Sequence, residues 1–228
     1  MRIGGFQPSS LIDYPGKVSA IVFTIGCNFR CPYCHNPELV YETASPIPEE
    51  EILAFLAKRA GVLPAVTVTG GEPTMHEDLP EFMRKIKALG YLVKLDSNGT
   101  NPAMLKQVVG ERLADYVAMD IKAPRAKYAT TVGAAVNEDA IRESVSFLLL
   151  GAVPYEFRTT IVRSQLSPED FLTIGKEIQG AARYFLQQFN PAKTLHPSFQ
   201  KKFSYSADEL ADIAESLKPY VEHCEIRA

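Results

Sequence analysis

Three cysteines in a C-x3-C-x2-C arrangement, Cys27, Cys31 and Cys34, are the residues with the most specific chemistry in the sequence. The chain has only one other cysteine, Cys224, which stands alone near the C-terminus. Four cysteines scattered at random would give this spacing only about 0.001 times per chain. In a cytosolic chain, clustered thiols more often bind metal or carry out redox chemistry than form structural disulfides. The triad therefore predicts a metal site.

The number of thiols indicates which kind of metal site the chain forms. A cube of four irons and four sulfides needs one external ligand per iron, so three thiolates leave one iron open for a cofactor or substrate. The alternative is a zinc site with His35 or Cys224 as fourth ligand, in an interaction module without catalysis. Structural zinc sites usually pair two C-x2-4-C elements, and the sequence has no second pair. We favour the open iron–sulfur cluster.

The rest of the chain alternates apolar, β-rich runs with amphipathic helical patterns, which predicts crossover units and a parallel sheet. Their Val, Ile, Phe and Tyr content is typical of strands buried on both faces. The six predicted strands are residues 18–25, 65–69, 91–96, 116–121, 155–162 and 183–189. Helices are expected to begin near Glu49, Ser167 and Ser206, which open acidic first turns or capping boxes.

No Pro/Gly/Ser-rich linker interrupts this alternation, so we predict one domain over residues 1–228. Residues 1–16 would form a strand and turn, residues 17–190 the barrel, and residues 191–228 a rim loop, a helix and a candidate edge strand at 221–227.

Distinctive polar residues cluster at the carboxyl ends of several predicted strands. Gly70-Gly71-Glu72-Pro73 follows the second strand, Asp96-Ser97-Asn98-Gly99 closes the third, and Asp120 and Lys122 end the fourth. A barrel draws its site from many strand ends at once, whereas an open sheet uses one crevice. We therefore predict the α/β class, as a partial (β/α)6 TIM-like barrel.

Composition excludes several other classes of protein. Hydrophobic residues make up 46% of the 228 residues and charged residues 22%, which is typical of a globular chain. A formal charge of -3 without long charged runs favours neither nucleic acid nor membrane as partner. The apolar run at 18–25 is too short to span a bilayer, and no cleavage pattern follows it. We expect a cytoplasmic protein.

The cysteine motif and its surroundings resemble a known superfamily. C-x3-C-x2-C after the first barrel strand is similar to the signature of radical S-adenosylmethionine (SAM) enzymes. The residues that resemble the glycyl-radical-enzyme activases in that superfamily are Gly16, Lys17, Phe23, Gly26, Tyr33, His35, Asn36 and Pro37. The strings from Ile12 to Gly16 and from Cys34 to Glu38 are most similar to anaerobic ribonucleoside-triphosphate reductase activating proteins. The resemblance covers essentially the whole chain and is strongest up to Lys122.

The resemblance implies roles around the cysteines. Cys27, Cys31 and Cys34 would ligate a [4Fe-4S] cluster whose open iron chelates SAM, and Tyr33 would lie near the adenine. Gly70, Gly71, Glu72 and Pro73 look like the element that meets the SAM amino group, with Glu72 as counter-charge. A plain strand-to-helix turn is the alternative for this last element.

The resemblance also implies roles for charged residues on later strands. Asp96, Ser97 and Asp120 match a pattern that holds a monovalent cation beside the SAM carboxylate, and Lys122 matches a residue offered to SAM itself. Capping or solvated acids are the alternative for both aspartates. Arg158 is expected at the SAM carboxylate or ribose, with a core salt bridge as the alternative.

The implied reaction is reductive cleavage of SAM to a 5′-deoxyadenosyl radical, which takes a Cα hydrogen from a glycine of a partner enzyme. The first choice of partner is anaerobic ribonucleoside-triphosphate reductase, with a flavodoxin or ferredoxin as electron donor. Pyruvate formate-lyase, another glycyl radical enzyme, or a small-molecule reaction such as that of 7-carboxy-7-deazaguanine synthase are alternatives. The segment from Lys193 to Pro197 is either a docking rim or a solvated loop, and Cys224 is expected to be inert.

Overall fold

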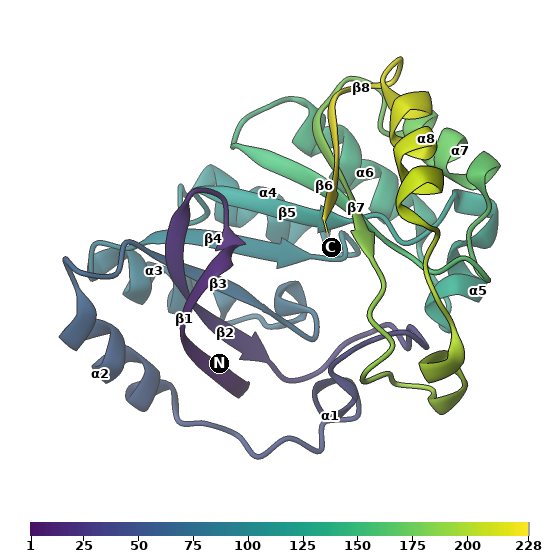
Figure 1. Cartoon of the computed structure of the whole chain (residues 1–228). Coiled ribbons are helices and arrows are strands. Elements are labelled where there is room, and N and C mark those ends of the chain that lie inside the picture. Colours follow the sequence, from purple (N-terminus) through teal and green to yellow (C-terminus); the bar gives the residue numbers. More distant parts are fainter. Residues whose placement is uncertain (228) are drawn as a thin grey trace.

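The computed structural model describes residues 1–227, so Ala228, the last residue of the expected domain, lies outside the described part (Figure 1). The elements are β1 (Ile3–Tyr14), β2 (Lys17–Thr24), α1 (Pro37–Val40), α2 (Glu49–Arg59), β3 (Ala65–Gly70), η1 (Pro73–Met75), α3 (Leu79–Ala88), β4 (Leu92–Ser97), α4 (Pro102–Gly110), β5 (Tyr116–Asp120), η2 (Arg125–Lys127), α5 (Tyr128–Val132), α6 (Glu138–Leu149), β6 (Tyr155–Ile161), α7 (Pro168–Glu177), β7 (Ala181–Gln188), η3 (Pro197–Lys201), α8 (Ala207–Leu217) and β8 (Val221–Arg227).

The strands form one eight-stranded sheet in sequence order, with β1 and β8 at its two edges (Figure 1). β1 pairs antiparallel with β2, and every later neighbour pairs in parallel. All six predicted strands are present with ends shifted by one or two residues. The candidate edge strand at 221–227 is also present, as β8, which adds a seventh parallel strand by pairing with β7. The sheet curves into a barrel that stays open between β1 and β8.

Local sequence signals explain where the elements begin. Gly16, at φ 71°, closes the turn between β1 and β2, where a type II turn needs a left-handed residue after proline. Ser167 with Asp170 and Ser206 with Glu209 form the predicted capping boxes of α7 and α8. Among residues 1–227, none of the helices has the length and apolar character needed to cross a bilayer.

The two faces of the sheet differ in chemistry, although both are buried. The face toward the helices is apolar, with Val66 and Val68 of β3 in the main core. The inner face carries polar and charged side chains, among them Thr67, Lys94 and Glu156, which are at most 2% exposed. Because successive side chains of a strand point to opposite faces, Lys94 and Asp96 share the inner face of β4. The barrel interior is therefore charged, which the apolar strand composition does not indicate.

Candidate active site

A cavity of about 210 Å³ lies at the carboxyl ends of the strands, where the sequence places its candidate residues. The loop after β2 and the ends of β3, β4 and β5 all contribute to its wall. The predicted residues that line it are Cys27, Cys31, Tyr33, Cys34, Gly70, Gly71, Glu72, Asp96, Ser97, Asp120 and Lys122. Pro73 and Arg158 are not among the lining residues. Nearly the whole predicted set therefore meets at one cavity.

The three cysteines lie on the loop between β2 and α1. Cys31 is buried and the other two are half-buried. The backbone N–H groups of Phe29 and Asn36 donate to the sulfur atoms of Cys27 and Cys34, at 3.4 and 3.5 Å. Burial raises the pKa of Cys27 to about 12 and that of Cys31 to about 11. Because a metal ligand must be a thiolate, loading the site releases protons from these thiols.

The donor set fits a polynuclear cluster better than a single ion. Within residues 1–227, no three His, Cys, Asp or Glu side chains converge closely enough to hold one metal ion, yet three cysteines line one cavity. The hydroxyl of Tyr33 is buried at the same cavity without a hydrogen-bond partner. Nδ1 of His35 lies 2.9 Å from the carbonyl oxygen of Lys193, and Cys224 is not among the lining residues. Of the two fourth ligands considered for zinc, Cys224 lies outside the cavity, and His35 lines it with its Nδ1 facing the Lys193 carbonyl.

Gly70 and Gly71 let the loop after β3 pack directly against the chain that leads to Cys27. The N–H of Gly71 donates to the carbonyl of Thr24 at 2.9 Å, and the N–H of Glu72 donates to that of Gly26 at 2.8 Å. A Cβ atom on Gly71 would lie 1.8 Å from the Gly26 carbonyl oxygen. The glycines therefore permit a close approach of two backbones beside the cysteine loop.

Glu72 connects the loops that follow β3 and β4. Its carboxylate accepts hydrogen bonds from the Ser97 hydroxyl at 2.9 Å and the Asn98 N–H at 2.6 Å. It also accepts from the N–H and hydroxyl of Thr74. Burial raises the pKa of Glu72, although these donors oppose the shift. Glu72, which is expected to face an amino group, thus also accepts hydrogen bonds from donors of the chain itself.

Five charged side chains form a continuous chain of ion pairs beside the cavity. Lys122 Nζ lies 2.9 Å from one oxygen of Asp120, and Arg158 Nε lies 2.9 Å from the other. Arg158 Nη1 lies 3.2 Å from Asp96, whose second oxygen is paired with Lys94. Arg158 forms the salt bridge that was its alternative, because it holds two aspartates and does not line the cavity, while its expected contact with SAM stays a prediction.

The neighbouring charges keep Asp96, Asp120 and Lys122 charged at neutral pH. Burial alone would raise the pKa of Asp120, but Arg158 and Lys122 lower it to about 2. The pKa of Asp96 is also lowered, because Arg158 and Lys94 outweigh its burial. Burial would lower the pKa of Lys122, yet Asp120 and other neighbouring groups raise it well above its usual value. Three positive and two negative side chains therefore share one buried region.

Sequence reasoning missed two parts of the site. Lys94 belongs to a strand that reads as apolar, and its position two residues before Asp96 was the available signal. The segment after β7 packs against the cysteine loop (Figure 1), where the N–H of His196 donates to the Pro32 carbonyl at 2.9 Å. Lys193 Nζ also lies 2.8 Å from Glu38. No spacing in the sequence indicates these contacts between distant segments.

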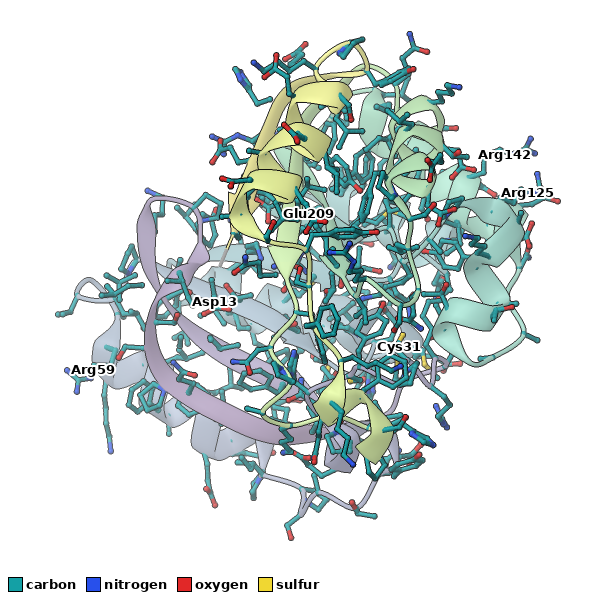
Figure 2. The ribbon with its side chains drawn as sticks, turned by 45° about the vertical axis from the view of Figure 1, so that its right-hand side comes forward. Asp13, Cys31, Arg59, Arg125, Arg142 and Glu209 are labelled. Carbon is teal, nitrogen blue, oxygen red and sulfur yellow. The ribbon has the colours of Figure 1, made fainter. Side chains whose placement is uncertain are left out.

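Figure 2 shows Cys31 well inside the outline of the molecule, with Arg125 and Arg142 projecting on one side and Arg59 on the other. Cys31 is buried, and the segment after β7 hydrogen-bonds to its neighbour Pro32, so the cysteine loop is partly covered.

The fold, the cysteine loop and the cavity together define the class of protein. The model of the radical SAM superfamily matches residues 21–148, which is more than half of the chain. The chain therefore belongs to the radical SAM superfamily, whose members are enzymes with a [4Fe-4S] cluster and SAM as cofactors.

Among individual proteins, the chain is similar to a protein of Methanocaldococcus jannaschii named "Putative glycyl-radical enzyme activating enzyme MJ1227", with 33% identity over 99% of this chain and 95% of the relative. It is 27% identical to 7-carboxy-7-deazaguanine synthase of Hyperthermus butylicus, over 78% of this chain and 83% of the relative.

Solved structures of this superfamily share the fold. SuiB of Streptococcus suis superposes with a TM-score of 0.68 at 16% identity, covering 91% of this chain and 48% of SuiB, so this chain spans about half of that protein. A domain of pyruvate-formate lyase-activating enzyme from Bacteroides vulgatus gives a TM-score of 0.56 at 16% identity, covering 72% of this chain and 99% of that domain. Such low identities establish the partial-barrel fold alone.

Proposed function

We propose that this protein is a glycyl-radical-enzyme activase, which generates a radical on a glycine of a partner protein. The observation that carries the proposal is the cavity shared by Cys27, Cys31 and Cys34 with the strand ends of a radical SAM barrel. The similarity of nearly the whole chain to a protein named as an activating enzyme supports the choice within the superfamily. We further propose that residues 1–228 act as one domain, since eight strands join one sheet.

The proposal gives each lining residue a task. Cys27, Cys31 and Cys34 would hold the [4Fe-4S] cluster, and Tyr33 would pack near the adenine of SAM. Gly70, Gly71, Glu72 and Ser97 would shape the wall that faces the amino acid part of SAM, with Pro73 next in the chain, and Lys122 would pair with its carboxylate. The cluster and SAM, when bound, supply one-electron cleavage of the sulfonium and removal of a hydrogen atom.

Arg158 has an indirect task in this proposal, because it reaches Lys122 only through Asp120. A monovalent cation at Asp96 and Asp120 stays a prediction. Both carboxylates already face basic side chains, which would compete with such a cation.

The proposed substrate is a glycine on a loop of a glycyl radical enzyme. Only glycine offers a Cα–H without a side chain beside it. Such a loop would have to reach the cavity at the strand ends, where the cysteine loop lies. Anaerobic ribonucleoside-triphosphate reductase is our first choice, on the resemblance of residues 12–16 and 34–38, and pyruvate formate-lyase is the second. We propose a flavodoxin or ferredoxin as electron donor and the cytoplasm as compartment, where thiols stay reduced.

The decisive experiment is anaerobic incubation of the reduced, reconstituted protein with SAM and each candidate partner. We expect a glycyl doublet in the electron paramagnetic resonance spectrum with one partner, and no doublet when Cys31→Ala replaces the wild type. A protein that cleaves SAM but gives no doublet with any glycyl radical enzyme would refute the activase function.

A small-molecule reaction is the second candidate, favoured by the 27% identity to 7-carboxy-7-deazaguanine synthase. Formation of the ring-contracted heterocycle in the same incubation, monitored by mass spectrometry, would support this candidate over the activase.

A further inference from the structure

Lys94 is a buried cation that the proposed reaction does not use. Its side chain is 2% exposed, and its ammonium group pairs with Asp96 on the same inner face of β4. A buried ammonium is costly unless paired, so its only stable position is against a carboxylate. Lys94 therefore fixes the end of the ion-pair chain that lies farthest from Lys122.

Every carboxylate oxygen in the ion-pair chain already faces a basic side chain. Asp96 gives one oxygen to Lys94 and the other to Arg158. Asp120 gives one oxygen to Arg158 and the other to Lys122. The hydroxyl of Ser97 is also engaged, since it donates to Glu72 at 2.9 Å and accepts from the Gly99 N–H at 3.0 Å.

The charge balance points in the same direction. A potassium or sodium ion at Asp96 would lie beside the positive charges of Lys94 and Arg158, which already pair with this carboxylate. Hard cations need several oxygen ligands with available lone pairs. The residues of this chain therefore do not fit the monovalent cation that the resemblance implies.

We propose that the ammonium of Lys94 takes the place of a monovalent cation at Asp96, so that ligand binding at this cavity is independent of potassium and sodium. Lys94 acts as a positioning residue: it orients Asp96, which orients Arg158, which in turn orients Asp120 and Lys122. Lys122, oriented by Asp120, then offers its ammonium to an anionic group without help from a dissolved ion. The expectation that no potassium or sodium ion binds does not depend on the proposed function, whereas the expected SAM affinity does.

The first test uses the wild-type reconstituted protein. Rubidium replaces potassium in oxygen-lined sites, and equilibrium dialysis against rubidium with SAM present counts bound ions. We expect no saturable rubidium binding, and less than about a twofold change in SAM affinity when choline chloride replaces potassium chloride at equal ionic strength. One rubidium bound per chain, or a loss of SAM affinity in choline chloride, would overturn the inference. This test needs no variant and so stands even if a Lys94 variant fails to fold.

The second test removes the internal ammonium. In Lys94→Gln we expect about one rubidium per chain and a SAM affinity that potassium restores by roughly tenfold, because Asp96 regains a free oxygen and loses its charge partner. Lys106→Gln is the matched control, since Lys106 forms an exposed ion pair with Glu143, and it should behave as wild type. A folded Lys94→Gln protein with wild-type SAM affinity and no rubidium binding would contradict the inference. If neither protein binds SAM, the rubidium count still tests Lys94 while the proposed function fails.

Discussion

The four cysteine thiols have different neighbours, and these neighbours indicate different roles. Cys27, Cys31 and Cys34 share one loop and one cavity, whereas Cys224 lies on the edge strand β8. Burial raises the pKa of Cys224 to about 12, as it does for Cys27, so what separates Cys224 from the triad is its position outside the cavity. The triad alone should therefore hold iron.

We expect Cys27→Ser, Cys31→Ser and Cys34→Ser each to lose most of the bound iron and sulfide, because a cube that lacks one protein ligand becomes labile. Cys224→Ser should keep the wild-type content. Iron and sulfide analysis after anaerobic reconstitution, with visible absorption spectra, checks both. Loss of the cluster in Cys224→Ser alone would show that the ligand set has been misassigned.

Arg158 supports two aspartates at once, Asp96, which is buried, and Asp120, which is half-buried. Arg158→Met should lower the free energy of unfolding by about 3 kcal/mol, because it leaves Asp96 and Asp120 each with one remaining cation. Arg84→Met, which breaks exposed ion pairs with Glu111 and Glu81, should cost less than about 1 kcal/mol. Urea unfolding of the iron-free proteins measures both. Equal losses in the two variants would mean that the buried chain contributes no more than a surface pair.

At the scale of elements, the joint between β3 and the cysteine loop leaves no room for a side chain. Gly71→Ala should cost several kcal/mol or displace the loop, because its Cβ would overlap the Gly26 carbonyl. Gly110→Ala at the end of α4, where no atom lies within 4 Å of the added carbon, should be neutral or stabilise by up to about 1 kcal/mol. Thermal unfolding and cluster content would show the contrast. A Gly71→Ala protein with wild-type stability and iron content would disprove the close packing.

The elements themselves were largely predictable. Alternating apolar and amphipathic runs located all six strands, and Ser167 and Ser206 located two helix starts, because periodicity and capping are local properties. The parallel pairing of β8 was not predictable, since residues 221–227 are mostly exposed and carry a weak pattern. Motifs at the strand ends predicted the candidate site. The partners of Arg158 could not be predicted in this way, because they depend on which side chains three strands bring together.

For the whole molecule, acid stability should reflect the buried carboxylates. The folded pKa of Asp120, about 2, lies below the value of roughly 3.9 expected in the unfolded chain, so its contribution is present above about pH 4 and is lost as the pH falls through about 2. Asp96 shifts in the same direction. Chemical unfolding of the iron-free protein between pH 5 and pH 2 should therefore show a steep loss of stability.

Asp120→Asn should show a shallower loss over the same pH range, because an amide does not titrate. Taking the difference between the two proteins removes the opposite contribution of Glu72, whose raised pKa favours the folded state in acid. Parallel stability curves for wild type and Asp120→Asn would rule out Asp120 as a source of the pH dependence.

The cysteine loop is held by two distant parts of the chain. Gly71 and Glu72, which are synthesised soon after the loop, contact it, and so do Lys193 and His196, which are synthesised much later. A chain still emerging from the ribosome has the three thiols long before the segment that packs over them exists. Iron delivered at that stage would meet an unfinished enclosure exposed to oxygen. Maturation of the metal centre should therefore follow completion of synthesis.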